Sequence, residues 1–173
     1  IQGLELPLVV VDPVMIAKSG DALLAPEAVM AMRVELLPLA LVVTPNIPEA
    51  ETMSGMAIET DADAREAARR IHDLGPRAVI IKGGHGTAAD VTDLLFDGKD
   101  FFEFRTPRIQ TRNTHGTGCT FASAVAAHLA LGASVAAATE LAQQYVAGAI
   151  RHALAIGHGH GPLDHFWRQP RLY

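Results

Sequence analysis

The sequence predicts an α/β fold in which a mostly parallel central sheet is flanked by helices. Three observations support this prediction. Short β-branched runs, of which Leu8–Asp12 is the first, have the composition of strands buried on both faces of a parallel sheet. These runs alternate along the chain with segments of helical periodicity. Polar residues directly follow each run, at the edge where an open parallel sheet binds its ligands.

The first half of the chain is predicted to hold two strands and two helices. A helix begins at Pro26, because proline suits a first helical turn, and Pro38 stops it. The second strand is Leu41–Val43. The clearest helix follows Thr60, whose hydroxyl can cap it, and ends at Gly75. The apolar face of that helix consists of Ala64, Ala67, Ala68, Ile71 and Leu74.

The second half begins with a third strand, Ala78–Ile81, which breaks into glycines. A hairpin over Val91–Thr106 is predicted to turn at Asp97-Gly98, a dipeptide typical of tight turns between strands. Two helices close the chain, one from about Thr117 and one over Val135–Ile156. Their apolar stripes are Phe121, Val125 and Leu129 in the first, and Val146, Ile150 and Leu154 in the second.

Composition excludes several classes of function. The 173 residues fit one domain, and no apolar run approaches the roughly eighteen residues of a membrane span. A net charge of -5 with scattered basic residues argues against a nucleic-acid partner. A single cysteine and no evident secretion leader indicate a reducing, cytoplasmic location. His158 and His160 are spaced like metal ligands, but no third ligand is evident, so we expect no metal site there.

Charged and polar side chains are predicted to converge at one edge of the sheet. Asp12 ends the first strand, Thr44 ends the second, and Lys82 ends the third. Asn46 and Glu49 follow the second strand closely. Each residue alone could belong to an ordinary solvated turn, and Lys82 could be a surface lysine. Because the carboxyl ends of parallel strands share one edge, we interpret the group as a site.

The stretch "GTGC" is predicted to bind phosphate. A helix that begins here leaves its first backbone N–H groups unpaired, and Gly116 and Gly118 let an anion approach them closely. A plain tight turn would explain the two glycines equally well. Asp12 and Glu49 favour the phosphate interpretation, because they could hold Mg²⁺ directly or through water. The stretch is neither a Walker A loop nor a dinucleotide fingerprint.

Cys119, the only cysteine, is predicted to act as a base. A helix N-terminus favours the thiolate form of a cysteine. Phosphoryl transfer to an alcohol needs a group that accepts the hydroxyl proton, while an anion hole and a metal hold the spreading charge. The alternative is a buried, inert cysteine that packs as a small hydrophobic residue. Lys82 faces the same edge and is predicted to neutralise phosphate charge.

Five stretches together resemble a known family. In chain order they are "DPVMIAKSGDALL", "TPNIPEAE", "IKGGH", "TRNTHGTGCTFASAVAA" and "GHGHGPLDHF". They resemble the hydroxymethylpyrimidine/phosphomethylpyrimidine kinases of thiamine biosynthesis, which belong to the ribokinase-like superfamily. The resemblance runs from about Val9 to Phe166, and five motifs in the same order make it specific.

The resemblance implies an enzyme and a role for each predicted site residue. That family uses ATP to phosphorylate the hydroxymethyl group of 4-amino-5-hydroxymethyl-2-methylpyrimidine, and then phosphorylates the monophosphate. The implied catalytic residues are Cys119, as general base, and Lys82. The implied binding residues are Gly116, Thr117 and Gly118 in the anion hole; Asp12, Thr44, Asn46 and Lys82 at the ATP phosphates; and Glu49 and Asp12 at Mg²⁺.

The chain departs from the family at its beginning. Relatives open with further strands and helices, whose "GGA"-type loops and ring-recognising residues are absent here. We therefore expect residues 1–173 to be the C-terminal portion of one ribokinase-like domain, with a sheet edge that another segment or chain covers. This part alone is expected not to be a competent enzyme, whereas the intact protein is expected to be one and to form a homodimer. Two alternatives stay open: a pyridoxal kinase of the cysteine-bearing type, and a non-catalytic pyrimidine-binding domain.

Overall fold

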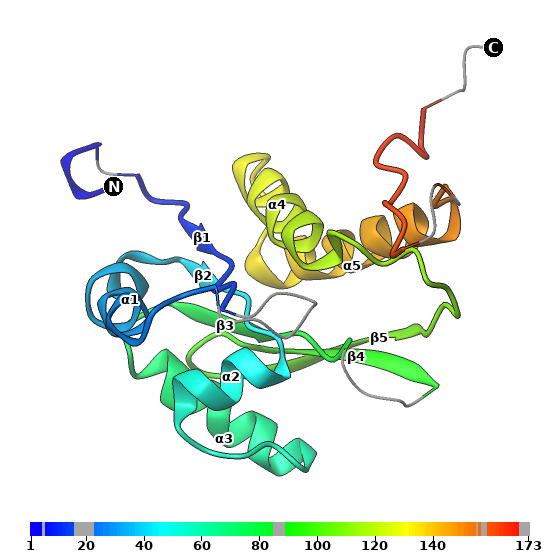
Figure 1. The fold of residues 1–173 in the computed structure, drawn as a ribbon. Helices are drawn as coiled ribbons and strands as arrows, with labels where there is room; N and C mark the ends of the chain where they lie inside the picture. Colours follow the sequence, from blue (N-terminus) through cyan, green and yellow to red (C-terminus); the bar gives the residue numbers. More distant parts are fainter. Residues whose placement is uncertain (5, 16–22, 85–88, 155, 157–158, 170–173) are drawn as a thin grey trace.

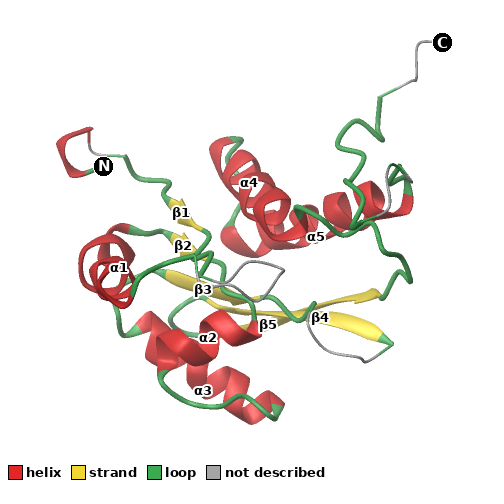
Figure 2. Ribbon diagram, viewed as in Figure 1, coloured by secondary structure: helices red, strands yellow, loops and turns green. Residues whose placement is uncertain are grey.

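A five-stranded sheet with helices on both faces forms the centre of the protein (Figures 1 and 2). The computed structural model describes residues 1–4, 6–15, 23–84, 89–154, 156 and 159–169. Most of the first motif after Met15, and also His158, lie outside these residues. The strands are β1 (Val10–Val11), β2 (Val42–Val43), β3 (Ala78–Ile81), β4 (Asp90–Phe96) and β5 (Phe101–Pro107). The α-helices are α1 (Pro26–Ala31), α2 (Ile47–Ser54), α3 (Asp61–His72), α4 (Thr117–Ala130) and α5 (Val135–Arg151). Short helical turns are η1 (Gln2–Leu4), η2 (Met32–Leu36) and η3 (Leu37–Leu39).

The strands lie side by side in chain order, from β1 to β5. The first three are parallel, and Val10 pairs with Val42, which in turn pairs with Ala78. The β3–β4 and β4–β5 pairs are antiparallel, and Phe96 faces Phe101 across the predicted hairpin. The predicted α/β class is confirmed, and the sheet is parallel where the predicted site lies. β1 lies at the edge of the sheet, as the sequence led us to expect.

The two faces of the sheet are covered by different helices, as Figure 1 shows. This arrangement follows from the alternation of side chains along a strand. Val43, Val79 and Phe96 belong to one core cluster, which includes residues of α2 and α3. Val42 and Leu95 point to the opposite face, into a cluster with residues of α4 and α5. Buried apolar side chains therefore fix the positions of α4 and α2 relative to the strand ends.

Two helix boundaries differ from the prediction. Pro38 does not stop the helical path after α1, because it occupies the first turn of η3, where a missing N–H is tolerated. The last helix ends at Arg151 rather than Ile156. The carbonyl of Ala149 accepts a hydrogen bond from the backbone N–H of Asp164 (3.1 Å), so the returning tail takes an acceptor that a longer helix would use. Leu154, predicted as part of the apolar stripe, is accordingly exposed beyond the helix. Within the described residues, no helix has the length and apolar character needed to cross a membrane.

Candidate active site

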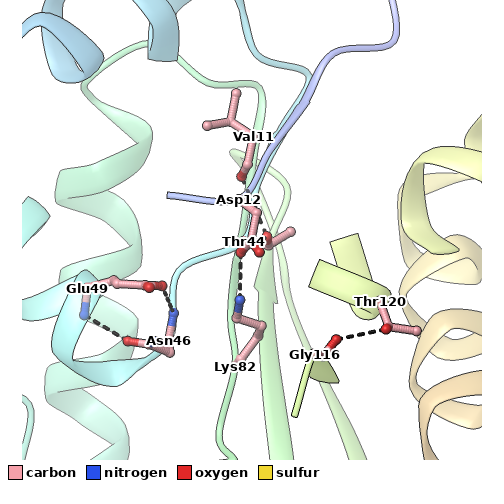
Figure 3. Close-up of polar contacts among 8 residues, drawn as sticks. All are labelled: Val11, Asp12, Thr44, Asn46, Glu49, Lys82, Gly116 and Thr120. Atoms are coloured by element: carbon pink, nitrogen blue, oxygen red, sulfur yellow. Dashed lines mark hydrogen bonds and ion pairs between the residues drawn. The ribbon is translucent and has the colours of Figure 1, made fainter. Parts of the chain in front are cut away.

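Three predicted residues meet at the carboxyl ends of the parallel strands. Asp12, Thr44 and Lys82 each directly follow β1, β2 and β3, and the register of these strands brings them together. The Lys82 Nζ lies 2.7 Å from the Asp12 Oδ1, and the Thr44 hydroxyl donates to the same oxygen at 3.1 Å. Figure 3 shows this contact at the centre of the site. The predicted convergence of these side chains is confirmed by the geometry.

The Asp12–Lys82 ion pair is largely removed from solvent. The exposed fractions of the two side chains are 14% and 13%, and Thr44 is fully buried. A buried charge is stable only when it is paired and hydrogen-bonded, so each member of the pair depends on the other. Lys82 is therefore not the surface lysine that was the alternative interpretation.

Asn46 and Glu49 form a reciprocal cap at the start of α2. The Glu49 N–H donates to the Asn46 Oδ1 at 2.9 Å, and the Asn46 N–H donates to the Glu49 Oε2 at 2.8 Å. This helix was not predicted from the sequence. Its signal was present, because asparagine followed three residues later by glutamate, with Pro48 between them, is typical of a helix start.

The carboxylate of Glu49 is buried against the site. Burial raises its pKa above the usual value, while the hydrogen bond from the Asn46 N–H and the positive charge of Lys82 act in the opposite direction. The negative charge of Asp12 also contributes to the raised pKa. The two carboxylates predicted to bind the metal therefore influence each other electrostatically, although they follow different strands.

The first turn of α4 has backbone N–H groups that no bond within the helix can satisfy. Gly116, at the cap position, has φ 83°, a left-handed conformation that favours glycine. Within the described residues no side chain caps this helix, unlike α2, α3 and α5, where Asn46, Thr60 and Ser134 do so. The Thr120 hydroxyl instead donates to the Gly116 carbonyl at 2.7 Å, as Figure 3 shows. The N–H groups of the first turn, residues 117–119, can therefore donate hydrogen bonds to an anion.

Gly118 lies in the first turn of this helix, close to the Asp12–Lys82 ion pair. A Cβ atom on Gly118 would lie 3.3 Å from the Lys82 Nζ and 3.8 Å from the Asp12 Oδ2. The glycine thus lets the helix N-terminus approach the two charges closely. Cys119, the next residue, is exposed, so it is not the buried, inert cysteine of the alternative interpretation. Thr117 uses its hydroxyl to donate to the Thr114 carbonyl at 3.3 Å.

The turn that precedes α4 is attached to the C-terminal tail. The backbone N–H of His115 donates to the carbonyl of Gly161 at 3.2 Å. A side chain at Gly161 would clash with Asn113, because its Cβ would lie 2.3 Å from the Asn113 Oδ1. The fourth and fifth sequence motifs, which are separate in the chain, therefore lie together beside the site.

The donors at this site suit a phosphate and a divalent cation. Lys82 and the α4 amides can bind anionic oxygens. No group of three or more His, Cys, Asp or Glu side chains that could hold a metal occurs in the described part of the chain. Mg²⁺ commonly uses one or two carboxylates together with substrate phosphates, so Asp12 and Glu49 fit its requirements.

One buried polar residue near the site was not predicted. Asp93 lies in β4, and its carboxylate accepts hydrogen bonds from the Gly83 N–H (3.0 Å) and from the Gln143 Nε2 (2.9 Å). The only sequence signal is position, because Asp93 faces the same side of its strand as Leu95 and thus points into the core. Its partners are too distant in the sequence to be identified from the pattern.

Comparison with known proteins identifies related chains. A sequence model of the phosphomethylpyrimidine kinase family matches residues 1–164. The thiamine biosynthesis bifunctional protein ThiED of Geobacter sulfurreducens is 53% identical over 158 residues, which cover 91% of this chain and 32% of that protein. The hydroxymethylpyrimidine/phosphomethylpyrimidine kinase of Bacillus subtilis is 48% identical over 159 residues, which cover 91% of this chain and 59% of that protein.

Solved structures show the same fold. A Bacillus subtilis pyridoxal kinase, determined as an ADP complex, matches with a TM-score of 0.89 and 40% identity over 98% of this chain and 64% of that chain. A phosphomethylpyrimidine kinase of Clostridium difficile matches with a TM-score of 0.74 and 38% identity over 86% of this chain and 60% of that chain. The chain spans less than two thirds of the length of each of these four proteins.

Proposed function

Because the chain belongs to the phosphomethylpyrimidine kinase family, we propose that the whole protein uses ATP to phosphorylate 4-amino-5-hydroxymethyl-2-methylpyrimidine and then its monophosphate. The observation that carries this proposal is the contact between two charge-binding elements. The N-terminus of α4 approaches the Asp12–Lys82 pair through Gly118, so amide groups and an ammonium group face the same space. Phosphoryl transfer depends chiefly on such preorganised donors.

Each residue of the site has a distinct role in the proposed reaction. The amides of residues 117–119 and the Lys82 ammonium group bind the oxygens of the transferring phosphoryl group. The Asp12 Oδ1 accepts from the Lys82 ammonium group and from the Thr44 hydroxyl, and these contacts hold Lys82 in place. Asn46 orients Glu49 through the α2 cap. Asp12 and Glu49 would hold Mg²⁺, which when bound neutralises part of the charge on the ATP phosphates.

Cys119 is proposed as the base of the first phosphorylation. Its sulfur takes the proton of the substrate hydroxyl as that oxygen bonds to the γ-phosphorus, the bond to the β–γ bridging oxygen breaks, and ADP leaves. The exposure of Cys119 at the α4 N-terminus supports this role. In the second phosphorylation the acceptor is a phosphate oxygen, already largely ionised at neutral pH because its second pKa is near 6. That step needs the base much less.

A second candidate is pyridoxal phosphorylation. It is favoured by the similarity to structures named pyridoxal kinase from Bacillus subtilis and Staphylococcus aureus, with TM-scores of 0.89 and 0.86. A non-catalytic pyrimidine-binding domain has less support, because Asp12, Asn46, Glu49, Lys82 and Cys119 are all present. We also propose that the whole protein is a cytoplasmic homodimer without nucleic-acid or membrane partners, as the sequence led us to expect.

A direct assay tests this proposal. The full-length protein should be incubated with ATP and Mg²⁺ and with either the aminopyrimidine alcohol, its monophosphate or pyridoxal, and products should be separated by anion-exchange chromatography. We expect turnover with both pyrimidine acceptors and a lower kcat/KM with pyridoxal. A strong preference for pyridoxal would establish the second candidate instead, and turnover of no acceptor would support the non-catalytic domain.

A further inference from the structure

A buried carboxylate outside the proposed catalytic set is bonded to the turn that follows Lys82. Asp93 of β4 is only 5% exposed. Its Oδ1 accepts the Gly83 N–H at 3.0 Å, and its Oδ2 accepts the Gln143 Nε2 at 2.9 Å. Burial raises the pKa of Asp93, while the bonds from Gly83 and Gln143 and the charge of Lys82 oppose the rise. Such a residue is costly to bury unless its oxygens are satisfied.

Gln143 attaches this carboxylate to the helical layer. It lies on α5, is 8% exposed, and donates through the same Nε2 to the carbonyl of Phe104 in β5 at 2.9 Å. The amide nitrogen thus bridges a strand carbonyl and a carboxylate. Three elements, β4, β5 and α5, are thereby joined to the end of β3.

Gly83 is held closely against β4. A Cβ atom at this position would lie 2.0 Å from the carbonyl oxygen of Thr92, so only glycine fits. Lys82, directly before it, donates its own N–H to the Pro45 carbonyl at 2.8 Å. The peptide groups on both sides of the Lys82 Cα are therefore fixed by hydrogen bonds, one to Pro45 and one to Asp93. These two bonds determine the direction in which the Lys82 side chain leaves the backbone.

We propose that Asp93, held by Gln143, is a positioning residue that fixes the Lys82–Gly83 peptide and so directs Lys82 toward Asp12 and the bound phosphate. An apolar side chain would fill the same core position without burying a charge. It would leave the Gly83 N–H without its acceptor, and the Lys82–Gly83 peptide would be held only by the packing of Gly83 against Thr92. This inference rests on the proposed kinase function in one respect, because it assigns the phosphate of ATP as the ligand of Lys82.

The test compares Asp93→Asn with Thr139→Val in the full-length protein. Asparagine has nearly the same shape but only one acceptor oxygen, so it cannot accept from both Gly83 and Gln143. It must lose either the bond to the Gly83 N–H or the support of Gln143, and the proposal requires both. Thr139 is fully buried on α5, one turn before Gln143, and its hydroxyl donates to the Val135 carbonyl at 2.8 Å. Its variant therefore disturbs α5 without touching Gly83.

The affinity for a non-hydrolysable ATP analogue, measured by calorimetry, is the main readout, with the KM for ATP and kcat beside it. We expect Asp93→Asn to weaken ATP binding about tenfold, because a misdirected Lys82 loses its charge-assisted hydrogen bond to the phosphate, and Thr139→Val to change it less than about twofold. The Gly83 amide proton resonance should also shift in Asp93→Asn and stay in place in Thr139→Val. Equal ATP affinities in the two variants would overturn the inference.

A second variant covers the case in which Asp93→Asn does not fold, and analogue binding separates this inference from the proposed function. If Asp93→Asn does not fold, Gln143→Met releases the carboxylate from the opposite side, and it should weaken ATP binding in the same direction. Unchanged affinity in that variant would also overturn the inference. Binding of the analogue needs no acceptor alcohol, so failure of the unaltered protein to phosphorylate any pyrimidine would reject the proposed function alone.

Discussion

At the scale of single residues, Asp12 organises the site before any ligand arrives. Its Oδ1 accepts both the Lys82 ammonium group and the Thr44 hydroxyl, at 2.7 and 3.1 Å. Its Oδ2 lies on the side of Gly118, toward the first turn of α4. One carboxylate therefore holds a cation in place and presents a second oxygen toward the proposed phosphate position. Donors held in this way need little reorganisation during a reaction.

Replacing the single residue Cys119 should affect the two proposed phosphorylations unequally. Cys119→Ser should lower turnover with the aminopyrimidine alcohol by about two orders of magnitude or more, the range for losing a general base. Turnover with the monophosphate should fall much less, because that acceptor is already ionised. Steady-state kinetics with each acceptor, and calorimetry with an ATP analogue to show that nucleotide binding persists, provide the measurement.

Ser123 offers a matched control for this prediction. It is exposed on α4, one turn beyond Cys119, and lies outside the first turn that presents amides. Ser123→Ala should leave both rates unchanged. A Cys119→Ser protein with near-normal turnover of the alcohol would remove the thiol from the mechanism.

At the scale of elements, the residues that cap α2 also belong to the proposed site. Asn46 and Glu49 satisfy each other's backbone N–H groups, as Thr60 and Asp63 do at the start of α3. The two caps have the same chemistry and different surroundings. Glu49 is buried beside Lys82 and Asp12, whereas Asp63 is only partly buried. Comparing them separates the stability of a helix from the function of the site.

We expect Asn46→Ala and Thr60→Ala to have similar effects on stability and different effects on activity. Each should lower the free energy of unfolding by about 1 kcal/mol, the usual effect of removing a helix cap. Only Asn46→Ala should reduce kcat/KM for ATP, because it also releases Glu49. Urea unfolding and steady-state kinetics of the two variants check this. An equal loss of activity in both would mean that the α2 cap only stabilises its helix.

The elements that the sequence could predict are those specified locally. The strands were recognisable as β-branched runs, and α3 by its cap at Thr60 and its apolar face. The end of α5 was not, because there the Ala149 carbonyl accepts a hydrogen bond from Asp164 of the returning tail, which the local pattern does not show. The role of Asp93 could not be predicted either, because its partner Gln143 lies fifty positions further along the chain. Asp12, Thr44 and Lys82 were predictable because strand ends of a parallel sheet share one edge.

At the scale of the whole molecule, the site lies where the two helical layers meet the sheet. The layer with α2 supplies Asn46 and Glu49, the layer with α4 supplies the amides of its first turn, and the strand ends between them supply the charges (Figures 1 and 3). Asp93 and Gln143 connect the sheet to the second layer from within the core. The geometry of the site therefore depends on the folding of all three layers together.

The buried carboxylate of Asp93 should make global stability depend on pH. Its folded-state pKa is raised above the usual 3.8 by burial, so the folded protein binds this proton more tightly than the unfolded chain does. A raised pKa of an acid contributes stability that is fully present below 3.8 and is lost as the pH rises through the folded-state value. Asn cannot titrate, so Asp93→Asn should lack this loss.

The measurement is urea unfolding of the unaltered protein, Asp93→Asn and Thr139→Val at intervals between about pH 4 and pH 8. The difference in unfolding free energy between the unaltered protein and Asp93→Asn should shrink as the pH rises, by at most about 1.4 kcal/mol per pH unit. Exposed carboxylates with lowered pKa values, such as Asp97, titrate in all three proteins and cancel from the difference. Thr139→Val keeps Asp93 and should parallel the unaltered protein. A difference between the unaltered protein and Asp93→Asn that does not vary with pH would show that Asp93 binds its proton equally in both states, which would contradict the effect of burial.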